Sequence, residues 1–513
     1  MTRIIAGGVP EPPCPPIAQI RRPCPSFVLR LRLSCDMPLS QRVFLMVLDG
    51  LRPDSVTSER MPNLARLGAG GVVFQRNHAV FPTVTRANSA SLATGVYPKG
   101  HGIPGNELVS EVVEQGRPFS TADADRLEQL RESRGGRVVM AATLADRIYA
   151  AGGRTAVVGT GSTGAALLQN PQGATRGEAF FHPRRIAGLD RSEIESALGP
   201  IPKRTTPNTE QNAFFTKLIT DVLCPADAHA LIVFWHTDPD HTQHAHGLGH
   251  PAVDQALAAA DKNLATILSA LDERPESWTV VVASDHGFSS VAEALGETDV
   301  TGVLIDAGLK ASPTSADVIP VDGGVYLSDA AAIRGTAIVS ALDGMPGIGA
   351  LFSGGNGAPV LPGTMDRTLL GQGGVLTPDI QYSVHWTLDE NAGGIAGLCA
   401  GPLGRLSGTH GSLSPLEVRN TLIMSGAGIK SGVVSDVPSG TIDVAPTLAE
   451  LLGVGWDGAC DGRILWEGMA GGPAPGTVSV TSDELEVVRG ARRQVLRRST
   501  VAGTTYLDQG GME

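Results

Sequence analysis

The sequence predicts an α/β fold in which a mostly parallel sheet is sandwiched by helices and an inserted cap subdomain interrupts the core. Three apolar runs, at residues 43–48, 230–235 and 279–283, have the continuous hydrophobic pattern of strands buried on both faces. Helical patterns separate these runs, and such alternation is typical of a parallel sheet covered on both sides. A later stretch rich in Gly, Pro, Asp and Thr breaks the alternation, which indicates the insertion.

The other core elements follow from apolar spacing and from glycines at their ends. The longest helical pattern places Val253, Leu257 and Leu264 on one face. We expect helices at residues 61–69, 141–151, 209–223, 252–271 and 444–452, and further strands at 155–158 and 421–424. Residues 106–137 are polar and unpatterned, which indicates a surface insertion. The residues from 476 onward are expected to wrap the core.

The expected core comprises residues 37–296 and 389–513, with residues 297–388 as the inserted cap. Residues 1–36 are rich in Pro and Arg, and we expect them to be either disordered or an extension upstream of a natural start at Met37. No apolar run approaches the ~20 residues that a membrane-spanning helix needs, so we expect a cytoplasmic protein. Six scattered cysteines without a Cys-x-x-Cys pair suit that compartment, where thiols stay reduced.

The net charge limits the classes of partner. A formal charge of -12 argues against a broad nucleic-acid footprint. It does not exclude an anionic small molecule, because bound metal ions can reverse the local potential. We therefore expect a small-molecule substrate and neither a nucleic acid nor a membrane as partner, while the oligomeric state stays open.

One glycine-rich motif has a well-known alternative function. Residues 159–164 (Gly-Thr-Gly-Ser-Thr-Gly) match the G-x-G-x-x-G pattern of dinucleotide-binding loops. That function also needs a following helix and a second strand with an acidic residue about 20 residues on. The chain instead continues through residues 170–173 (Asn-Pro-Gln-Gly), without a strand to carry the acid. We therefore interpret the motif as a glycine-rich turn.

Chemically active side chains stand next to the expected strands. Asp49 ends the first strand, where open α/β sheets bind ligands, and Thr85 precedes a helical run whose free N–H groups favour an oxyanion. Asp240 and His244 are four residues apart, so one helical turn places them on the same face. Taken singly, Asp49 and Thr85 are equally well explained as a turn cap and a helix cap.

Two more segments extend this pattern. Asp285 and His286 adjoin at the end of the 279–283 strand, and His410 precedes the strand at 421–424. Oxygen and nitrogen ligands without thiolates suit a catalytic zinc or similar divalent ion. A single residue of this kind is usually structural, and we interpret five histidines in that way: His101, His182, His241, His246 and His250. The joint occurrence of the remaining groups near strand ends predicts a metal site.

These segments resemble the alkaline phosphatase superfamily and, within it, the type I phosphodiesterase/nucleotide pyrophosphatase family. The resemblance covers about residues 40–290 and 400–460. The matching motifs are Asp49-Gly50-Leu51-Arg52-Pro53-Asp54, Pro82-x-x-Thr85-x-x-Asn88, Thr94-Gly95-x-Tyr97-Pro98-x-x-His101-Gly102-Ile103, Asp238-Pro239-Asp240-x-x-x-His244, Asp285-His286-Gly287 and His410-Gly411. As a set they are highly specific.

The resemblance implies a metal-dependent hydrolase of phosphodiester or pyrophosphate bonds, acting on a small phosphate ester or nucleotide-like substrate with two divalent ions, expected to be zinc. One ion is expected on Asp49, Asp285, His286 and the Thr85 oxygen, and the other on Asp240, His244 and His410. Thr85 is then the expected nucleophile of a phospho-threonine intermediate, and Asn106 is expected to bind a non-bridging phosphoryl oxygen. A threonine hydroxyl is too weak an acid to ionise at neutral pH, but metal coordination can deprotonate it, as it does bound water.

Arg86 departs from the family pattern, in which nucleotide-cleaving members usually have an aromatic residue after the nucleophile. A guanidinium beside Thr85 can make bidentate contacts to a phosphoryl group, which favours a more highly charged monoester or an anionic leaving group. Alternatively, Arg86 points away and pairs with a surface acid.

Other activities and a non-enzymatic function remain as alternatives. A phosphonoacetate hydrolase-like enzyme resembles the same Thr85 and Gly105-Asn106 pattern, and a phosphomonoesterase would suit Arg86. Related phosphomutases usually have serine at the nucleophile position and sulfatases need cysteine or serine, so Thr85 counts against both. A non-catalytic phosphate-binding relative would be free to lose ligands, whereas every expected ligand type is present here.

Overall fold

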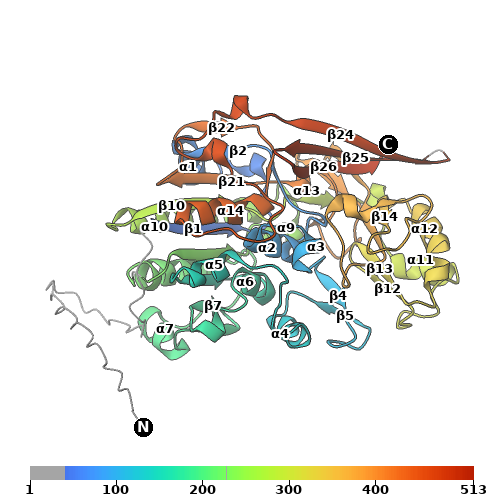
Figure 1. Cartoon of the computed structure of the whole chain (residues 1–513), viewed down its shortest axis with the longest axis horizontal. Helices are drawn as coiled ribbons and strands as arrows, with labels where there is room; N and C mark the ends of the chain where they lie inside the picture. The colour runs from blue at the N-terminus through green and yellow to red at the C-terminus, as the bar shows by residue number, and fades with distance from the viewer. Residues whose placement is uncertain (1–40, 227, 491) are drawn as a thin grey trace, which may run out of the picture.

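A nine-stranded sheet forms the centre of the molecule (Figure 1). The structure is a computed structural model that describes residues 41–226, 228–490 and 492–513, so the expected N-terminal extension lies outside the described residues. Strand β1 (Gln41–Leu48) pairs in parallel with β9 (Leu231–His236) on one side and with β10 (Ser277–Ala283) on the other. These are the three apolar runs of the sequence, now at the middle of the sheet.

The remaining strands extend the sheet on both sides. Its order is β22-β2-β21-β10-β1-β9-β6-β7-β8. The outer strands are β6 (Thr155–Gly159), β7 (Phe180–His182), β8 (Arg185–Ala187), β21 (Leu422–Gly426), β2 (Val72–Phe74) and β22 (Val433–Ser435). Strand β21 runs antiparallel to β10 and β2, and β8 runs antiparallel to β7, while the other pairs are parallel. The sheet is therefore mostly parallel, as predicted.

Helices cover both faces of the sheet, which explains why its central strands are apolar throughout. Phe44, Met46 and Leu48 belong to one buried cluster, whereas Val43 and Leu45 belong to the other. The first cluster includes α1 (Pro62–Gly70), α8 (Thr209–Leu218) and α10 (Pro251–Asp272), and the second includes α2 (Thr85–Thr94), α5 (Leu144–Ala150), α6 (Thr163–Gln169) and α14 (Thr441–Leu452). The predicted sandwich is confirmed. None of the described helices is both long enough and apolar enough to span a bilayer.

Residues 300–384 form a subdomain with its own core, at the right of Figure 1. It contains a five-stranded sheet in the order β12-β13-β16-β14-β15. Its elements are α11 (Val300–Asp306), β12 (Val318–Val321), β13 (Gly324–Leu327), α12 (Gly335–Asp343), β14 (Ile348–Ser353), β15 (Met365–Asp366) and β16 (Ile380–Val384). The chain returns to the core through a four-stranded sheet of β17 (Trp386–Glu390), β18 (Ala396–Cys399), β11 (Ser289–Val291) and β19 (Gly408–Thr409).

Two regions are more regular than the sequence indicated. The prediction of an unpatterned insertion at residues 106–137 is wrong, because this segment forms a hairpin, β4 (Glu107–Val109) with β5 (Pro118–Ser120), and helix α4 (Ala124–Ser133). Leu127 and Leu130 anchor that helix in the core. The C-terminal residues form an antiparallel sheet of β24 (Thr481–Arg489), β25 (Arg492–Val501) and β26 (Thr504–Met512), drawn in dark red in Figure 1.

The glycine-rich motif after β6 is a turn that leads into α6. A short helix and a second parallel strand, β7, do follow the motif, whereas no such strand was expected, but β7 carries no acidic residue. Gly164 lies against the backbone of the 121–122 segment, where a Cβ would stand 1.9 Å from the Thr121 carbonyl oxygen. The third glycine of the motif is therefore required by close packing within the protein.

The remaining short elements are α3 (Pro98–His101), α7 (Arg191–Leu198), a π-helical turn (Ile219–Leu223), α9 (Asp240–His246), α13 (Pro415–Val418), β3 (Asn77–His78), β20 (Arg419–Asn420) and β23 (Ser439–Gly440).

Candidate metal centre and active site

The carboxyl ends of the three central strands bring the expected ligands together. Asp49 directly follows β1, Asp240 begins α9 four residues after β9 ends, and Asp285 follows β10 after a single residue. Because β1, β9 and β10 are parallel neighbours, their carboxyl ends meet at one edge of the sheet. The adjacent Asp238 anchors the segment before α9, since its carboxylate accepts hydrogen bonds from the Asn208 N–H and the Thr242 hydroxyl.

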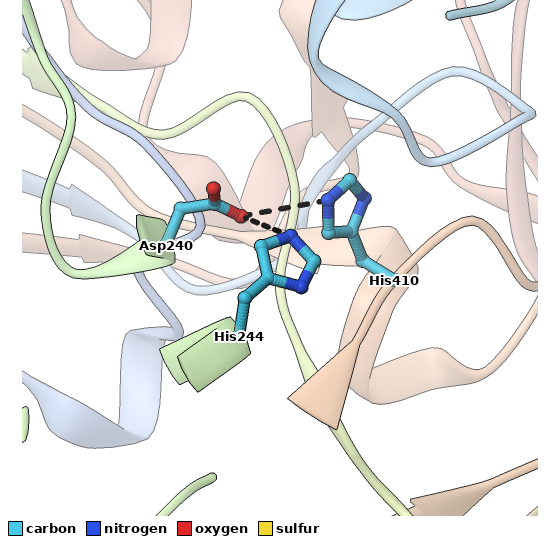
Figure 2. Close-up of side chains that lie close together, drawn as sticks. All are labelled: Asp240, His244 and His410. Carbon is cyan, nitrogen blue, oxygen red and sulfur yellow. Dashed lines mark ion pairs between the residues drawn. The ribbon is translucent and has the colours of Figure 1, made fainter. Parts of the chain in front are cut away.

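Asp240, His244 and His410 form the first group of candidate ligands (Figure 2). Asp240 and His244 lie one turn apart on α9, and His410 directly follows β19. The Asp240 Oδ1 atom lies 3.3 Å from His244 Nε2 and 3.4 Å from His410 Nε2. Figure 2 shows both imidazole rings turned toward this one carboxylate oxygen.

Asp49, Asp285 and His286 form the second group, and all three are buried. The His286 Nε2 atom lies 3.3 Å from Asp285 Oδ2 and 3.6 Å from Asp49 Oδ1. The Thr85 hydroxyl oxygen is 3.3 Å from the same nitrogen, so it lies beside this group. Six of the seven expected ligand side chains thus gather in two clusters, and the seventh, Thr85, adjoins the second.

The separations within each group match those of ligand atoms around one ion. Two ligand atoms that are each ~2.0–2.1 Å from a tetrahedral zinc ion are about 3.3 Å apart. The separations of 3.3–3.6 Å between the facing oxygen and nitrogen atoms are close to that value. They are too long for the hydrogen bonds that a carboxylate makes to a charged imidazole, which are typically about 2.7–2.9 Å.

Five of the candidate ligands are anchored by one side-chain atom while another atom faces the cluster. All three imidazole rings engage a backbone carbonyl through Nδ1, which fixes the Nε2 lone pair toward the cluster. The pairs are His244 with Gly408 at 2.9 Å, His286 with Gly287 at 2.8 Å and His410 with Thr83 at 2.8 Å. Ring orientation and tautomer are therefore set before any ion binds.

Two of the three carboxylates, those of Asp49 and Asp285, are likewise anchored through one oxygen. Trp235 Nε1 donates to Asp49 Oδ2 at 2.9 Å, and the Gly50 N–H donates to Asp285 Oδ1 at 3.0 Å. Three oxygens face the cluster and are buried without a hydrogen-bond partner among the described residues: Asp49 Oδ1, Asp240 Oδ1 and Asp285 Oδ2. Buried carboxylate oxygens without partners are costly unless a cation binds there. The residues present therefore fit a pair of divalent metal ions.

The electrostatics of the cluster lead to the same conclusion. Burial raises the pKa of Asp49 well above its ordinary value, and the carboxylates of Asp285 and Asp240 raise it further. Burial likewise raises the pKa of Asp285. Burial also acts to raise the pKa of Asp240, but His244 and His410 outweigh it and hold that pKa below its ordinary value. Bound cations would stabilise the ionised form of all three carboxylates.

Thr85, Arg86 and Asn106 lie together at the start of α2. Thr85 is the first residue of this helix and is 3% exposed. The Arg86 N–H donates to Asn106 Oδ1 at 3.2 Å, which orients the Asn106 amide so that its N–H groups point away from the helix backbone. Arg86 does not pair with a surface acid among the described residues; its side chain lines a cavity of about 270 Å³ together with Asp49, Thr85 and Asp240.

Sequence reasoning missed the opposite wall of this cavity and the residue that holds Asp49. Arg184 and Arg204 line the cavity from the segments after β7 and α7, which show no recognisable motif. Trp235 stands directly before His236 at the end of β9, and its apolar ring explains its place in the strand without any functional role. The structural histidines include His101, which is fully buried, and His182, which bonds the Gly161 carbonyl.

Comparisons with known proteins place the chain in a family. Residues 43–331 match the model of the type I phosphodiesterase / nucleotide pyrophosphatase family. The curated Bis(5'-adenosyl)-triphosphatase enpp4 of Xenopus laevis is 39% identical over 67 residues, which are 13% of this chain and 15% of that protein's length. The chain thus matches a small part of that relative.

Solved structures share the fold at low sequence identity. A quadruple mutant of the alkaline phosphatase PafA has a TM-score of 0.65 at 15% identity, covering 85% of this chain and 100% of that chain. Murine ectonucleotide pyrophosphatase / phosphodiesterase 5 has a TM-score of 0.55 at 16% identity, covering 82% and 98%. The human protein of that name has 0.54 at 16% identity, covering 82% and 96%. The fold is therefore alkaline phosphatase-like, and the chain belongs to the type I phosphodiesterase / nucleotide pyrophosphatase family.

Proposed function

We propose that this protein hydrolyses phosphodiester or pyrophosphate bonds in small phosphate esters or nucleotide-like molecules, with Thr85 as nucleophile and two divalent metal ions, zinc by ligand type. The observation that carries the proposal is the place of the Thr85 hydroxyl, 3.3 Å from His286 Nε2 and on the wall of the cavity that Asp49 also lines. One ion would be held by Asp49, Asp285, His286 and Thr85. The other would be held by Asp240, His244 and His410.

The residues of the chain divide the chemistry between them. When bound, the ions supply Lewis acidity that lowers the pKa of coordinated oxygen and stabilises charge on the attacking and leaving oxygens. Thr85 Oγ1 attacks phosphorus, the ester oxygen leaves, and water then cleaves the phospho-threonine to regenerate the hydroxyl. Asn106 Nδ2, which has no hydrogen-bond partner among the described residues, is free to donate to a non-bridging phosphoryl oxygen.

The test is the hydrolysis of bis(p-nitrophenyl) phosphate by zinc-loaded protein. We expect turnover with zinc, none after chelation, and none for Thr85→Ala even though that variant retains both ions. Thr94→Ala is the matched control, because Thr94 ends the same helix and its hydroxyl bonds only the Ala90 carbonyl. Undiminished turnover by Thr85→Ala would contradict the mechanism, and loss of turnover by Thr94→Ala would show that the assay reports on folding.

A phosphomonoesterase or phosphonoacetate hydrolase-like activity is the second candidate, and Arg86 favours it. The Arg86 side chain lines the cavity, and its buried Nε has no hydrogen-bond partner. A guanidinium aimed at the reacting group stabilises a dianionic monoester more than a monoanionic diester. If this activity dominates, p-nitrophenyl phosphate will be the better substrate and Arg86→Ala will reduce its kcat/KM more than that of the diester. Equal losses for both substrates would leave the diesterase as the function.

A further inference from the structure

A second cavity adjoins the one that contains Thr85. Its volume is about 310 Å³, and it shares Gly161, Arg184 and Arg204 with the first cavity. Gly161 lies in the turn after β6, and a Cβ there would come within 3.5–3.6 Å of Trp235 and Thr237. The glycine-rich motif therefore forms part of the boundary between the two cavities, a role that the metal site does not use.

The shared wall is cationic. The first cavity is lined by three arginines and three aspartates, Arg86, Arg184, Arg204, Asp49, Asp123 and Asp240. These charges balance, so most of the charge of two bound divalent ions would be left uncompensated. The second cavity adds Arg191 and Lys203 against a single carboxylate, Glu195. A substrate with one negative charge cannot neutralise such a surface.

The two shared arginines are held differently. Arg204 donates to the Thr237 hydroxyl at 2.9 Å and is attracted electrostatically by Asp49 and Asp240, so it faces the reactive cavity. The Arg184 guanidinium makes no hydrogen bond or ion pair with any residue that the structure describes. Its backbone N–H, in contrast, bonds His182 Nδ1 at 3.1 Å. Arg191 already pairs with Glu195 and donates to the Pro183 carbonyl, so its guanidinium is less available than that of Arg184 to bind an anionic group of a substrate.

We propose that Arg184 and Arg204 form a subsite for a second anionic group of the substrate, a carboxylate or a phosphoryl group, carried on the part of the molecule that is not transferred to Thr85. The preferred substrate is then a phosphoric ester or anhydride with two separated anionic centres. This inference rests on the proposed function, since the first anionic centre is the phosphoryl group at the metal ions. No bond is made or broken at the subsite, which binds and orients only.

Matched inhibitors measure the contribution of the second anion directly. In zinc-loaded protein, 3-phosphonopropionate and 4-phosphonobutyrate are each compared with the alkylphosphonate of the same length, so that only the terminal carboxylate differs. We expect one spacer length to show an inhibition constant about tenfold lower for the carboxylate-bearing compound than for its alkylphosphonate, in keeping with one hydrogen-bonded charge pair. A parallel bisphosphonate of that length distinguishes a phosphoryl-selective subsite from a carboxylate-selective one.

The variants assign this gain to the two arginines. The quantity compared is the inhibition constant of the alkylphosphonate divided by that of its carboxylate-bearing partner. Arg184→Ala and Arg204→Ala should each reduce this ratio, and the double variant should bring it near one. Arg184→Glu should bring it below one. Arg66→Ala removes the same charge from an exposed position on α1, where Arg66 bonds Asn63, and should leave the ratio unchanged. A ratio that survives in the double variant would show that the carboxylate merely chelates zinc. That result, or a ratio near one for the unsubstituted protein at every length, would overturn the proposal.

The two proposals can fail separately. Calorimetric titration of zinc-loaded Thr85→Ala with the same compounds measures binding without turnover. If the unsubstituted protein hydrolyses the p-nitrophenyl diester but the carboxylate brings no gain, the subsite is wrong and the proposed function stands. If turnover is absent while the calorimetric gain depends on Arg184 and Arg204, the subsite stands and the proposed function is wrong.

Discussion

At five of the candidate ligands, the protein engages one side-chain atom while another atom faces the cluster. Backbone carbonyls hold the three imidazole rings, and Trp235 and Gly50 hold two of the carboxylates. This arrangement fixes the tautomers and the ring planes, and in metalloproteins the loss of such a supporting contact typically lowers metal affinity by about 10–100-fold. The sequence could indicate the ligands, because their residue types are specific. It could not indicate the carbonyls of Thr83 and Gly408, since every residue has a carbonyl.

Trp235→Phe tests the role of this support for Asp49. The substitution removes the Nε1–H that bonds Asp49 Oδ2 while it keeps an aromatic ring in β9. We expect zinc affinity at one of the two sites to fall by about 10–100-fold, measured by competition with a chromogenic chelator. Trp278→Phe is the matched control, because Trp278 is also buried but its Nε1 has no hydrogen-bond partner. Equal affinities in the two variants would contradict the role of Trp235.

His101 makes stability depend on pH. Its Nδ1 accepts from the Ile103 N–H and its Nε2 contacts the Ser91 hydroxyl, so the ring is held neutral, and burial lowers its pKa to about 3. As the pH falls below about 6.5, the unfolded chain binds a proton there and the native state does not. His101→Asn should therefore reduce the slope of unfolding free energy against pH, between pH 6 and 4, by about 1.4 kcal/mol per pH unit. Urea unfolding at several pH values measures this slope, and parallel slopes would contradict the expectation.

At the scale of elements, the helices and strands that the sequence predicts are those whose pattern of apolar residues matches the faces that they bury. Strands β1, β9 and β10 read as apolar runs because helices cover both of their faces. The hairpin β4–β5 was missed because its strands have three residues each and expose most of their side chains. The sequence of β24 does contain a pattern that predicts a strand. Leu485 and Val487 alternate with exposed charged residues, and Gly490 follows in the turn to β25.

Gly164 shows how the packing of a short helix supports the active site. Its N–H donates to the Ala122 carbonyl at 2.8 Å, and a side chain at this position would collide with the Thr121 carbonyl. The segment that it contacts supplies Ser120, Ala122 and Asp123 to the wall of the cavity.

Gly164→Ala should lower the free energy of unfolding by about 1–3 kcal/mol, because the added methyl group forces the helix and this segment apart. Urea denaturation measures the change. Gly455→Ala is the control, since a Cβ at Gly455 meets nothing within 4 Å, and it should stay within about 0.5 kcal/mol of the unsubstituted protein. Equal stabilities for the two variants would show that α6 can move without cost.

At the scale of the whole molecule, the fold places residues from distant parts of the chain around one cavity. Asp49 and His410 come from opposite ends of the core, and the antiparallel pairing of β19 with β11 brings His410 beside the end of β10. Motif spacing could indicate that such segments meet, because strand ends of a parallel sheet share an edge. It could not indicate Arg184 and Arg204, since their segments have no pattern that specifies where they fold.

The most direct test of the account is a crystal structure of the zinc-soaked protein with anomalous diffraction recorded on both sides of the zinc absorption edge. The account predicts two anomalous peaks in each chain, one among Asp240, His244 and His410 and one among Asp49, Asp285 and His286, the second in contact with Thr85 Oγ1. No peak among these side chains, or a Thr85 oxygen outside bonding distance of the second peak, would contradict it.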